Sequence, residues 1–188
     1  MRIKSVQFEP GKFYHIYNHA AQNSLLFKEA GDYVLCLGLM QGYFNTQDFS
    51  MVAFCLMPNH YHVLIRQNGE CPIYLIMNKL WFRYSKYFNK KYACKGSVFA
   101  GKAQHKLVDR EEYLLRLSAY IHLNPVSAGL AASPQDWAWS NYREWIGLRD
   151  KYPCDYNVCK SYYTDFNKYR ELMEEISLEK SVHKYLLD

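Results

Sequence analysis

The sequence has few of the features that would place it in a membrane or secreted class. No apolar run approaches the about 20 residues that a membrane-spanning helix needs, and the polar N-terminus shows no signal peptide. The six cysteines form no Cys-x-x-Cys pair, and several lie in apolar runs, which indicates reduced, mostly buried thiols. With 188 residues the chain can build one domain with a substantial core. We therefore expect a cytoplasmic protein without a membrane anchor or a disulfide framework.

Carboxylates are missing from one long stretch of the chain. The net charge is only +5, but no Asp or Glu lies between Glu70 and Asp109, where many lysines gather. Aromatic residues make up 17% of the chain, which exceeds what a core requires and leaves rings that can stack on unpaired bases. A basic segment without acids to pair with it indicates a polyanionic partner.

The most informative motif is a His-x-His pair directly after a turn. Residues 51–56 are rich in strand-forming side chains and predict a buried strand, and Pro58-Asn59 predicts a tight turn before the next strand. Side chains alternate along a strand, so His60 and His62 share one face, roughly 7 Å apart. Two exposed imidazoles on a rigid strand could form half of a metal site. The pair alone is equally compatible with two histidines that only make hydrogen bonds.

Hydrophobic periodicity gives the order of the other elements. We expect strands over 13–19, 51–56, 60–65 and 104–108, and helices over 29–44, over 71–92 and after Asp109, which would be the N-cap. The order strand-helix-strand-strand-helix-strand predicts an α+β, ferredoxin-like (RRM-like) split βαβ fold, with an antiparallel sheet and helices on one face. We assign residues 1–148 to this domain and 149–188 to a C-terminal helical extension that is helical from about Tyr162. Function must be argued from the site, because this fold supports many functions.

The helix expected over 71–92 carries a row of bases at spacings of four, three and four. These residues, called the α2 stripe below, are Lys79, Arg83, Lys86 and Lys90. The spacing places them on one helical face, and without nearby acids we interpret that face as a phosphate-binding surface rather than an ordinary solvated one. Lys102 belongs to the same predicted DNA-binding set. Aromatic residues interleave with the stripe, and we expect at least two of them to be core: Trp81, Phe82, Tyr87 and Phe88.

The helix after Asp109 adds a tyrosine and an amide. Tyr120 and Asn124 are four residues apart and share a face, whereas His122 points away from both. Pro125 should push Asn124 out of the helical conformation, so we expect the helix to end there. Read singly, the tyrosine is typical of a core residue and Asn-Pro of a turn.

Taken together, these segments resemble the single-tyrosine HUH transposases, and among them the REP-associated tyrosine transposases. The resemblance covers roughly residues 8–147. The matching segments, in family order, are Met57-Pro58-Asn59-His60-Tyr61-His62, Gly96-Ser97-Val98-Phe99, Tyr120-Ile121-His122-Leu123-Asn124-Pro125 with the following Val126-Ser127-Ala128-Gly129-Leu130, and Trp137-Ala138-Trp139-Ser140-Asn141-Tyr142. The chain departs from the family pattern at His19 and Ser127, where relatives often have Arg.

The resemblance implies the roles of these residues. His60, His62 and Asn124 would hold Mg²⁺ or Mn²⁺, and Tyr120 would be the nucleophile that forms a 5′-phosphotyrosine. The implied function is metal-dependent cleavage and strand transfer on single-stranded or hairpin DNA, by a monomer or a homodimer. Two alternatives stay open: an RRM-like protein that binds single-stranded nucleic acid without strand transfer, and a metallohydrolase that uses His60 and His62 with water as the nucleophile.

Overall fold

The computed structural model describes residues 8–21, 24–44, 46–155, 161 and 166–178. In chain order the elements are β1 (Phe13–His19), α1 (Ala30–Phe44), β2 (Phe49–Met57), β3 (His60–Gln67), α2 (Ile73–Lys91), β4 (Gln104–Val108), α3 (Glu111–Ser127), the 3-10 helix η2 (Pro134–Asp136), α4 (Tyr142–Trp145) and α6 (Phe166–Leu178). The predicted order of strands and helices is confirmed through α3. The expected start of the last helix near Tyr162, and the predicted thiol of Cys159, lie outside the described residues.

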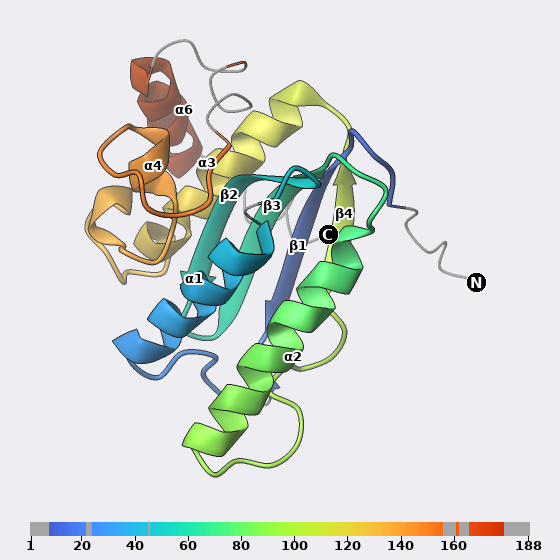
Figure 1. Ribbon diagram of the computed structural model, residues 1–188. Coiled ribbons are helices and arrows are strands. Elements are labelled where there is room, and N and C mark those ends of the chain that lie inside the picture. Colours follow the sequence, from blue (N-terminus) through green and yellow to red (C-terminus); the bar gives the residue numbers. More distant parts are fainter. Residues whose placement is uncertain (1–7, 22–23, 45, 156–160, 162–165, 179–188) are drawn as a thin grey trace, which may run out of the picture.

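The four strands form one antiparallel sheet in the order β2-β3-β1-β4 (Figure 1). β2 and β3 are joined directly by the Pro58-Asn59 turn, as the sequence predicts. The crossovers through α1 and α2 place β1 and β3 in the centre of the sheet. This topology is the split βαβ arrangement and confirms the ferredoxin-like, α+β prediction.

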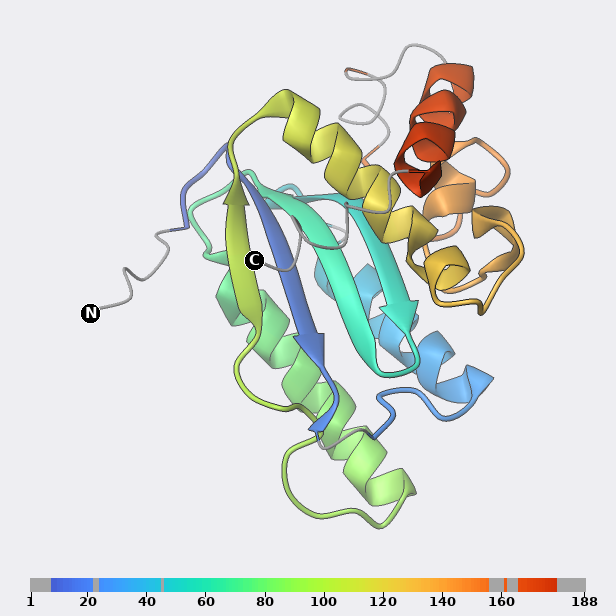
Figure 2. The same ribbon diagram turned by 180° about the vertical axis from the view of Figure 1, so that it is seen from behind.

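Helices cover both faces of the sheet, which differs from the expectation of helices on one face. α1 and α2 lie on one face, over a core that contains Tyr14 and Ile16 of β1 and Tyr61 of β3. α3 crosses the opposite face (Figure 2), where Leu117 and Ile121 pack against alternate strand residues. The reason lies in β2, whose nine residues are all buried. A strand that is apolar along its whole length needs a cover on each side.

The C-terminal part of the chain is anchored to α3 through His122. This buried imidazole lies 2.6 Å from the Tyr169 hydroxyl of α6 and 3.0 Å from Asn141 Oδ1. It therefore points away from Tyr120, as the helical spacing predicts, and joins α6 to the second core. The domain boundary at residue 148 stays a prediction. No helix within the described ranges is long and apolar enough to cross a membrane.

Two predictions about α3 are wrong. Its N-cap residue is Arg110 rather than Asp109, and no side chain caps the helix there. The helix also continues through Pro125 to Ser127. Proline removes one intrahelical N–H bond and crowds the preceding turn. Here it sits in the last turn, where the Leu130 amide bonds to the Pro125 carbonyl and Ala128 bonds to Asn124, so the helix end is closed locally.

The segment over residues 137–142, which carries one of the matching motifs, lines the outer edge of β2. The Asn141 side chain accepts from the Phe54 amide at 2.7 Å and donates to the Val52 carbonyl at 3.0 Å. The Leu56 amide donates to the Trp139 carbonyl at 2.9 Å. These bonds satisfy backbone groups that an open sheet edge would leave free to pair with another chain.

The described cysteines agree with the expectation of reduced thiols. Five are free, of which two are buried, two are half-buried and one is exposed: Cys36, Cys55, Cys71, Cys154 and Cys94.

Candidate active site

β1 and β3 bring histidines from two strands to the face that α3 crosses. Their register pairs Tyr17 with His62 and His19 with His60. Directly paired residues of antiparallel strands point to the same face, so the alternate residues of β1, including His15, join the His-x-His pair. The sequence pattern placed these residues on one face of each strand, but it did not pair the strands.

His60 and His62 form an adjacent pair with different exposure. Their rings lie 5.1 Å apart and nearly perpendicular. His60 is half-buried, but His62 is only 1% exposed, so the expectation of two exposed histidines is wrong for His62. Burial lowers the pKa of His60 and, with the neighbouring histidines, holds the pKa of His62 well below its usual range. Both imidazoles are therefore neutral near pH 7, which is the form that binds metal.

α3 brings Tyr120 and Asn124 to the same point. Because the helix continues past Asn124, the two side chains share a regular helical face. Asn124 Oδ1 lies 3.0 Å from His60 Nε2, and the Tyr120 ring lies 5.6 Å from the His62 ring. Asn124 is also linked to Tyr120 by a side-chain hydrogen bond. One amide thus contacts both a candidate metal ligand and the candidate nucleophile.

The environment of Tyr120 disfavours its phenolate. The side chain is 7% exposed, and burial raises its pKa, while the hydrogen bond from Asn124 lowers it in part. A phenol with a raised pKa is a poor nucleophile at neutral pH unless a cation or base lies nearby. The rival Tyr113, two turns earlier on α3, is half-buried beside Tyr17 and Arg110, and burial raises its pKa as well.

The hydrogen bonds of His60 indicate where a cation fits. Its Nδ1 lies 2.7 Å from Asn59 Oδ1 and its Nε2 lies 3.0 Å from Asn124 Oδ1. A neutral imidazole has one N–H and can donate to only one of these oxygens. If it donates to Asn59, the lone pairs of Nε2 and Asn124 Oδ1 face each other, and a shared cation would stabilise them.

The donor set as a whole fits a weakly held divalent ion. It comprises two neutral imidazoles and an amide oxygen, with no carboxylate. A hard ion such as Mg²⁺ prefers oxygen ligands and keeps positions for phosphate oxygens. No group of three or more His, Cys, Asp or Glu side chains in the described part of the chain is arranged to hold an ion.

His15 lies directly behind His62 and is a residue that the sequence reasoning did not assign to the site. It is fully buried, with its Nε2 3.0 Å from His62 Nδ1. If His62 donates this hydrogen bond, its Nε2 keeps the lone pair that a metal needs, whereas the reverse tautomer blocks that atom. His15 is thus placed to set the tautomer of His62. The signal available in the sequence was the alternation of His15, Tyr17 and His19.

Lys106 also points to this face, since it pairs with His15 across β1 and β4. Burial, followed by the charge of Lys106, lowers the pKa of His15 to about 3. The sequence placed Lys106 in the basic interval but gave no reason to separate it from the other lysines.

The predicted DNA-binding residues lie on the opposite side of the sheet. All four side chains of the α2 stripe are exposed on α2, and Lys102 is exposed in the loop before β4. Among the interleaved aromatic residues Trp81 and Phe88 are core, as expected, whereas Phe82 is 70% exposed. The structure therefore brings His60, His62, Tyr120 and Asn124 together and separates them from the basic set.

Comparisons with known proteins bear on this arrangement. A sequence profile of the family described as "Transposase IS200 like" matches residues 13–124, from the start of β1 to Asn124. A solved structure of a REP-associated tyrosine transposase bound to a REP hairpin is similar over 82% of this chain and 98% of that chain, with a TM-score of 0.62 and 14% identity. A putative transposase from Deinococcus radiodurans R1 is similar over 68% of this chain and 98% of that chain, with a TM-score of 0.42 and 12% identity. No curated protein matches the chain. The first of these structures confirms the fold.

Proposed function

This chain belongs to the family of IS200-like transposases, and we propose that it is a metal-dependent endonuclease and strand transferase of single-stranded DNA. The observation that carries the proposal is the convergence of His60 and His62 from β3 with Tyr120 and Asn124 from α3 on one face of the sheet. The similar REP-associated transposase is bound to a DNA hairpin, which supports hairpin DNA as the substrate class.

His60, His62 and Asn124 would hold Mg²⁺ or Mn²⁺, which when bound supplies positive charge beside the scissile phosphate. The residues of the chain have separate tasks. His15 holds His62 in the tautomer that leaves Nε2 free. Asn124 orients the Tyr120 hydroxyl, and α3 excludes water from most of the Tyr120 ring.

In the proposed reaction the Tyr120 oxygen attacks the scissile phosphorus. The bond between phosphorus and the 3′ oxygen breaks, the 5′ phosphate stays on Tyr120, and the net proton transfer is from the phenol to the released 3′ oxygen. Attack by the 3′-hydroxyl of another strand reverses these changes. Strand joining therefore needs no ATP, because the phosphotyrosine retains the phosphoester.

The test is the detection and mapping of a covalent adduct. Protein is incubated with hairpin oligonucleotides that carry single-stranded flanks, with Mn²⁺ or EDTA, and resolved on a denaturing gel. A 3′-end label should stay with the protein and a 5′-end label should be released, because the 5′ phosphate is the retained group. Peptide mapping should place the adduct on Tyr120.

Matched tyrosine variants serve as the control. Tyr120→Phe removes one oxygen and should form no adduct, whereas Tyr113→Phe should form it at the wild-type rate. An adduct that carries the 5′ label, that persists in Tyr120→Phe or that maps to Tyr113 would overturn the assignment of the nucleophile.

A second candidate function, binding of single-stranded nucleic acid without cleavage, is favoured by the position of the α2 stripe. The stripe lies on the face away from Tyr120, so it can bind DNA whether or not the catalytic face is active. This function predicts hairpin binding with no adduct under any metal condition.

A further inference from the structure

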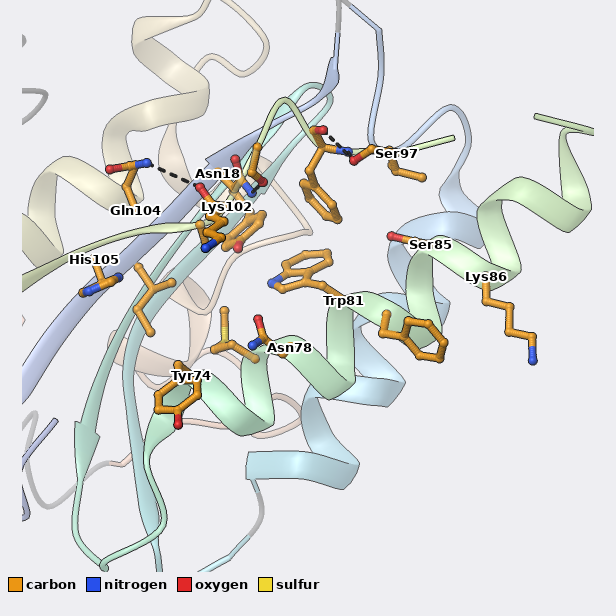
Figure 3. A pocket seen from close by; sticks show the side chains of 18 of the residues that line it. Asn18, Tyr74, Asn78, Trp81, Ser85, Lys86, Ser97, Lys102, Gln104 and His105 are labelled. Atoms are coloured by element: carbon orange, nitrogen blue, oxygen red, sulfur yellow. Dashed lines mark hydrogen bonds between the residues drawn. The ribbon is translucent and has the colours of Figure 1, made fainter. Parts of the chain in front are cut away.

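The α2 face of the sheet carries a pocket that the catalytic proposal does not use. It has a volume of about 1350 Å³ and lies between α2, the loop before β4 and the edge of the sheet (Figure 3). Small-molecule sites usually measure about 300–1,000 Å³, so this space can hold a longer ligand segment. The sheet separates it from Tyr120, because Tyr61 lines the pocket while His60 and His62 point to the other face.

The walls of the pocket are aromatic and basic. Tyr74 and Phe82 are exposed at its margin, and Trp81 lies deeper. Lys102 and Lys86 also line it, and in Figure 3 the Lys86 side chain points away from the cavity toward the outer surface of α2. No Asp or Glu occurs among the described residues that line the pocket. These walls suit a planar ring attached to an anionic chain.

Two buried polar atoms at the pocket have no hydrogen-bond partner in the described part of the chain. They are the Tyr61 hydroxyl and Trp81 Nε1, on side chains that are 0% and 7% exposed. The two rings stack 4.1 Å apart and nearly parallel, so the in-plane N–H and hydroxyl do not align as donor and acceptor. Figure 3 shows the nitrogen-bearing edge of Trp81 turned toward the side that holds Asn78 and Lys102. Buried donors of this kind are usually satisfied by a ligand or by water.

We propose that this pocket binds an unpaired base of the DNA strand that flanks the hairpin. The base would stack on Phe82 and the neighbouring rings, its ring nitrogens or carbonyls would accept from Trp81 Nε1, and Lys102 would contact a phosphate. The proposal rests on single-stranded DNA as the substrate of the proposed function. It adds a base-binding subsite on the face opposite Tyr120, next to the α2 stripe, which supplies phosphate contacts along the same helix.

The test compares two probes with equal charge. One is a dA oligonucleotide of twelve nucleotides, and the other has the same sugar-phosphate chain with an abasic residue at every position. Fluorescence anisotropy at fixed salt should show that wild type binds the base-bearing probe about tenfold tighter, as expected for one stacked base. Phe82→Ala should reduce this preference to about twofold, and Trp81→Phe, which retains a ring but removes the N–H, should also reduce it.

Matched variants separate this proposal from the catalytic one. Val34→Ala removes an apolar side chain that is 60% exposed on α1, away from the pocket, and Tyr120→Phe alters the other face. Both should keep the wild-type preference. The proposal is overturned if wild type shows no preference or if Phe82→Ala keeps it in full. If the preference depends on Phe82 while wild type forms no adduct with any hairpin, the pocket stands and the strand-transfer proposal fails. An adduct together with a pocket-independent preference gives the converse result.

Discussion

Lowering the pH from 7 to 5 should destabilise the fold through its buried histidines. His15 and His122 are both fully buried. Burial, together with the charge of Lys106, lowers the pKa of His15 to about 3, and burial lowers the pKa of His122 to about 4, although the hydrogen bond with Asn141 raises it in part. In the unfolded chain each would have a pKa of about 6.5. The unfolded state therefore binds protons that the folded state excludes, and stability is present above pH 6.5 and lost as the pH falls toward 3–4.

The size of the effect follows from the distance between pH 5 and the unfolded pKa. This distance is about 1.5 units, and each unit corresponds to about 1.4 kcal/mol, so each histidine should cost about 2 kcal/mol. The two together should cost about 4 kcal/mol, which is large beside a typical free energy of unfolding of about 5–15 kcal/mol. His62, whose pKa is also held below its usual range, acts in the same direction. Carboxylates contribute little here, because their unfolded pKa values lie near 4.

Urea denaturation at pH 7, 6 and 5, in EDTA so that metal release does not contribute, measures this loss directly. His15→Phe keeps an aromatic ring and removes one titrating group, so its free energy of unfolding should fall by about 2 kcal/mol less than that of wild type between pH 7 and pH 5. A wild-type change below about 1 kcal/mol, or an unchanged pH dependence in His15→Phe, would refute the reasoning.

Three further outcomes are expected. His60→Ala and His62→Ala should each abolish Mn²⁺ binding in calorimetry and adduct formation, and His62→Ala should also lower the urea midpoint more, because His62 is the more buried of the two; retained Mn²⁺ binding would contradict the ligand assignment. His15→Phe should weaken Mn²⁺ binding by about 10–100-fold through the orientation of His62, and an unchanged affinity would contradict its positioning role. Reversing the four α2 stripe residues to Glu should reduce the slope of log affinity against log salt by roughly 0.7 per phosphate contact without changing the adduct rate at saturating DNA, and an unchanged slope would mean that the stripe is only solvated.

Local patterns were sufficient to predict the elements and most of the candidate site. Alternation along a strand placed His60 and His62 on one face, and helical spacing placed Tyr120 with Asn124. The Pro58-Asn59 turn fixed the hairpin between β2 and β3. Each of these features depends on residues close together in the chain, which is why the sequence alone reveals them.

Features that depend on tertiary packing were missed or wrong. The local preference before proline predicted that α3 ends at Asn124, but the helix continues because its last carbonyls bond to the following turn. The place of His15 behind His62 required the register between β1 and β3, which no local pattern encodes. The second helical layer could have been inferred from β2, since an uninterrupted apolar strand predicts burial on both faces.

The His60-Tyr61-His62 motif itself connects the two faces of the sheet. Its first and third residues point to the catalytic face, and Tyr61, between them, lines the pocket on the α2 face. A shift of one residue in the register of β3 would exchange them. The loop before β4 fixes the same strand end, because its Phe99 bridges to Ala20 and packs against Trp81, and the Ala100 amide donates to the His19 carbonyl. A DNA strand held on the α2 face must pass this end or the short edge strand β4 to reach Tyr120. The loop and β4 are therefore where the binding and catalytic faces are physically coupled.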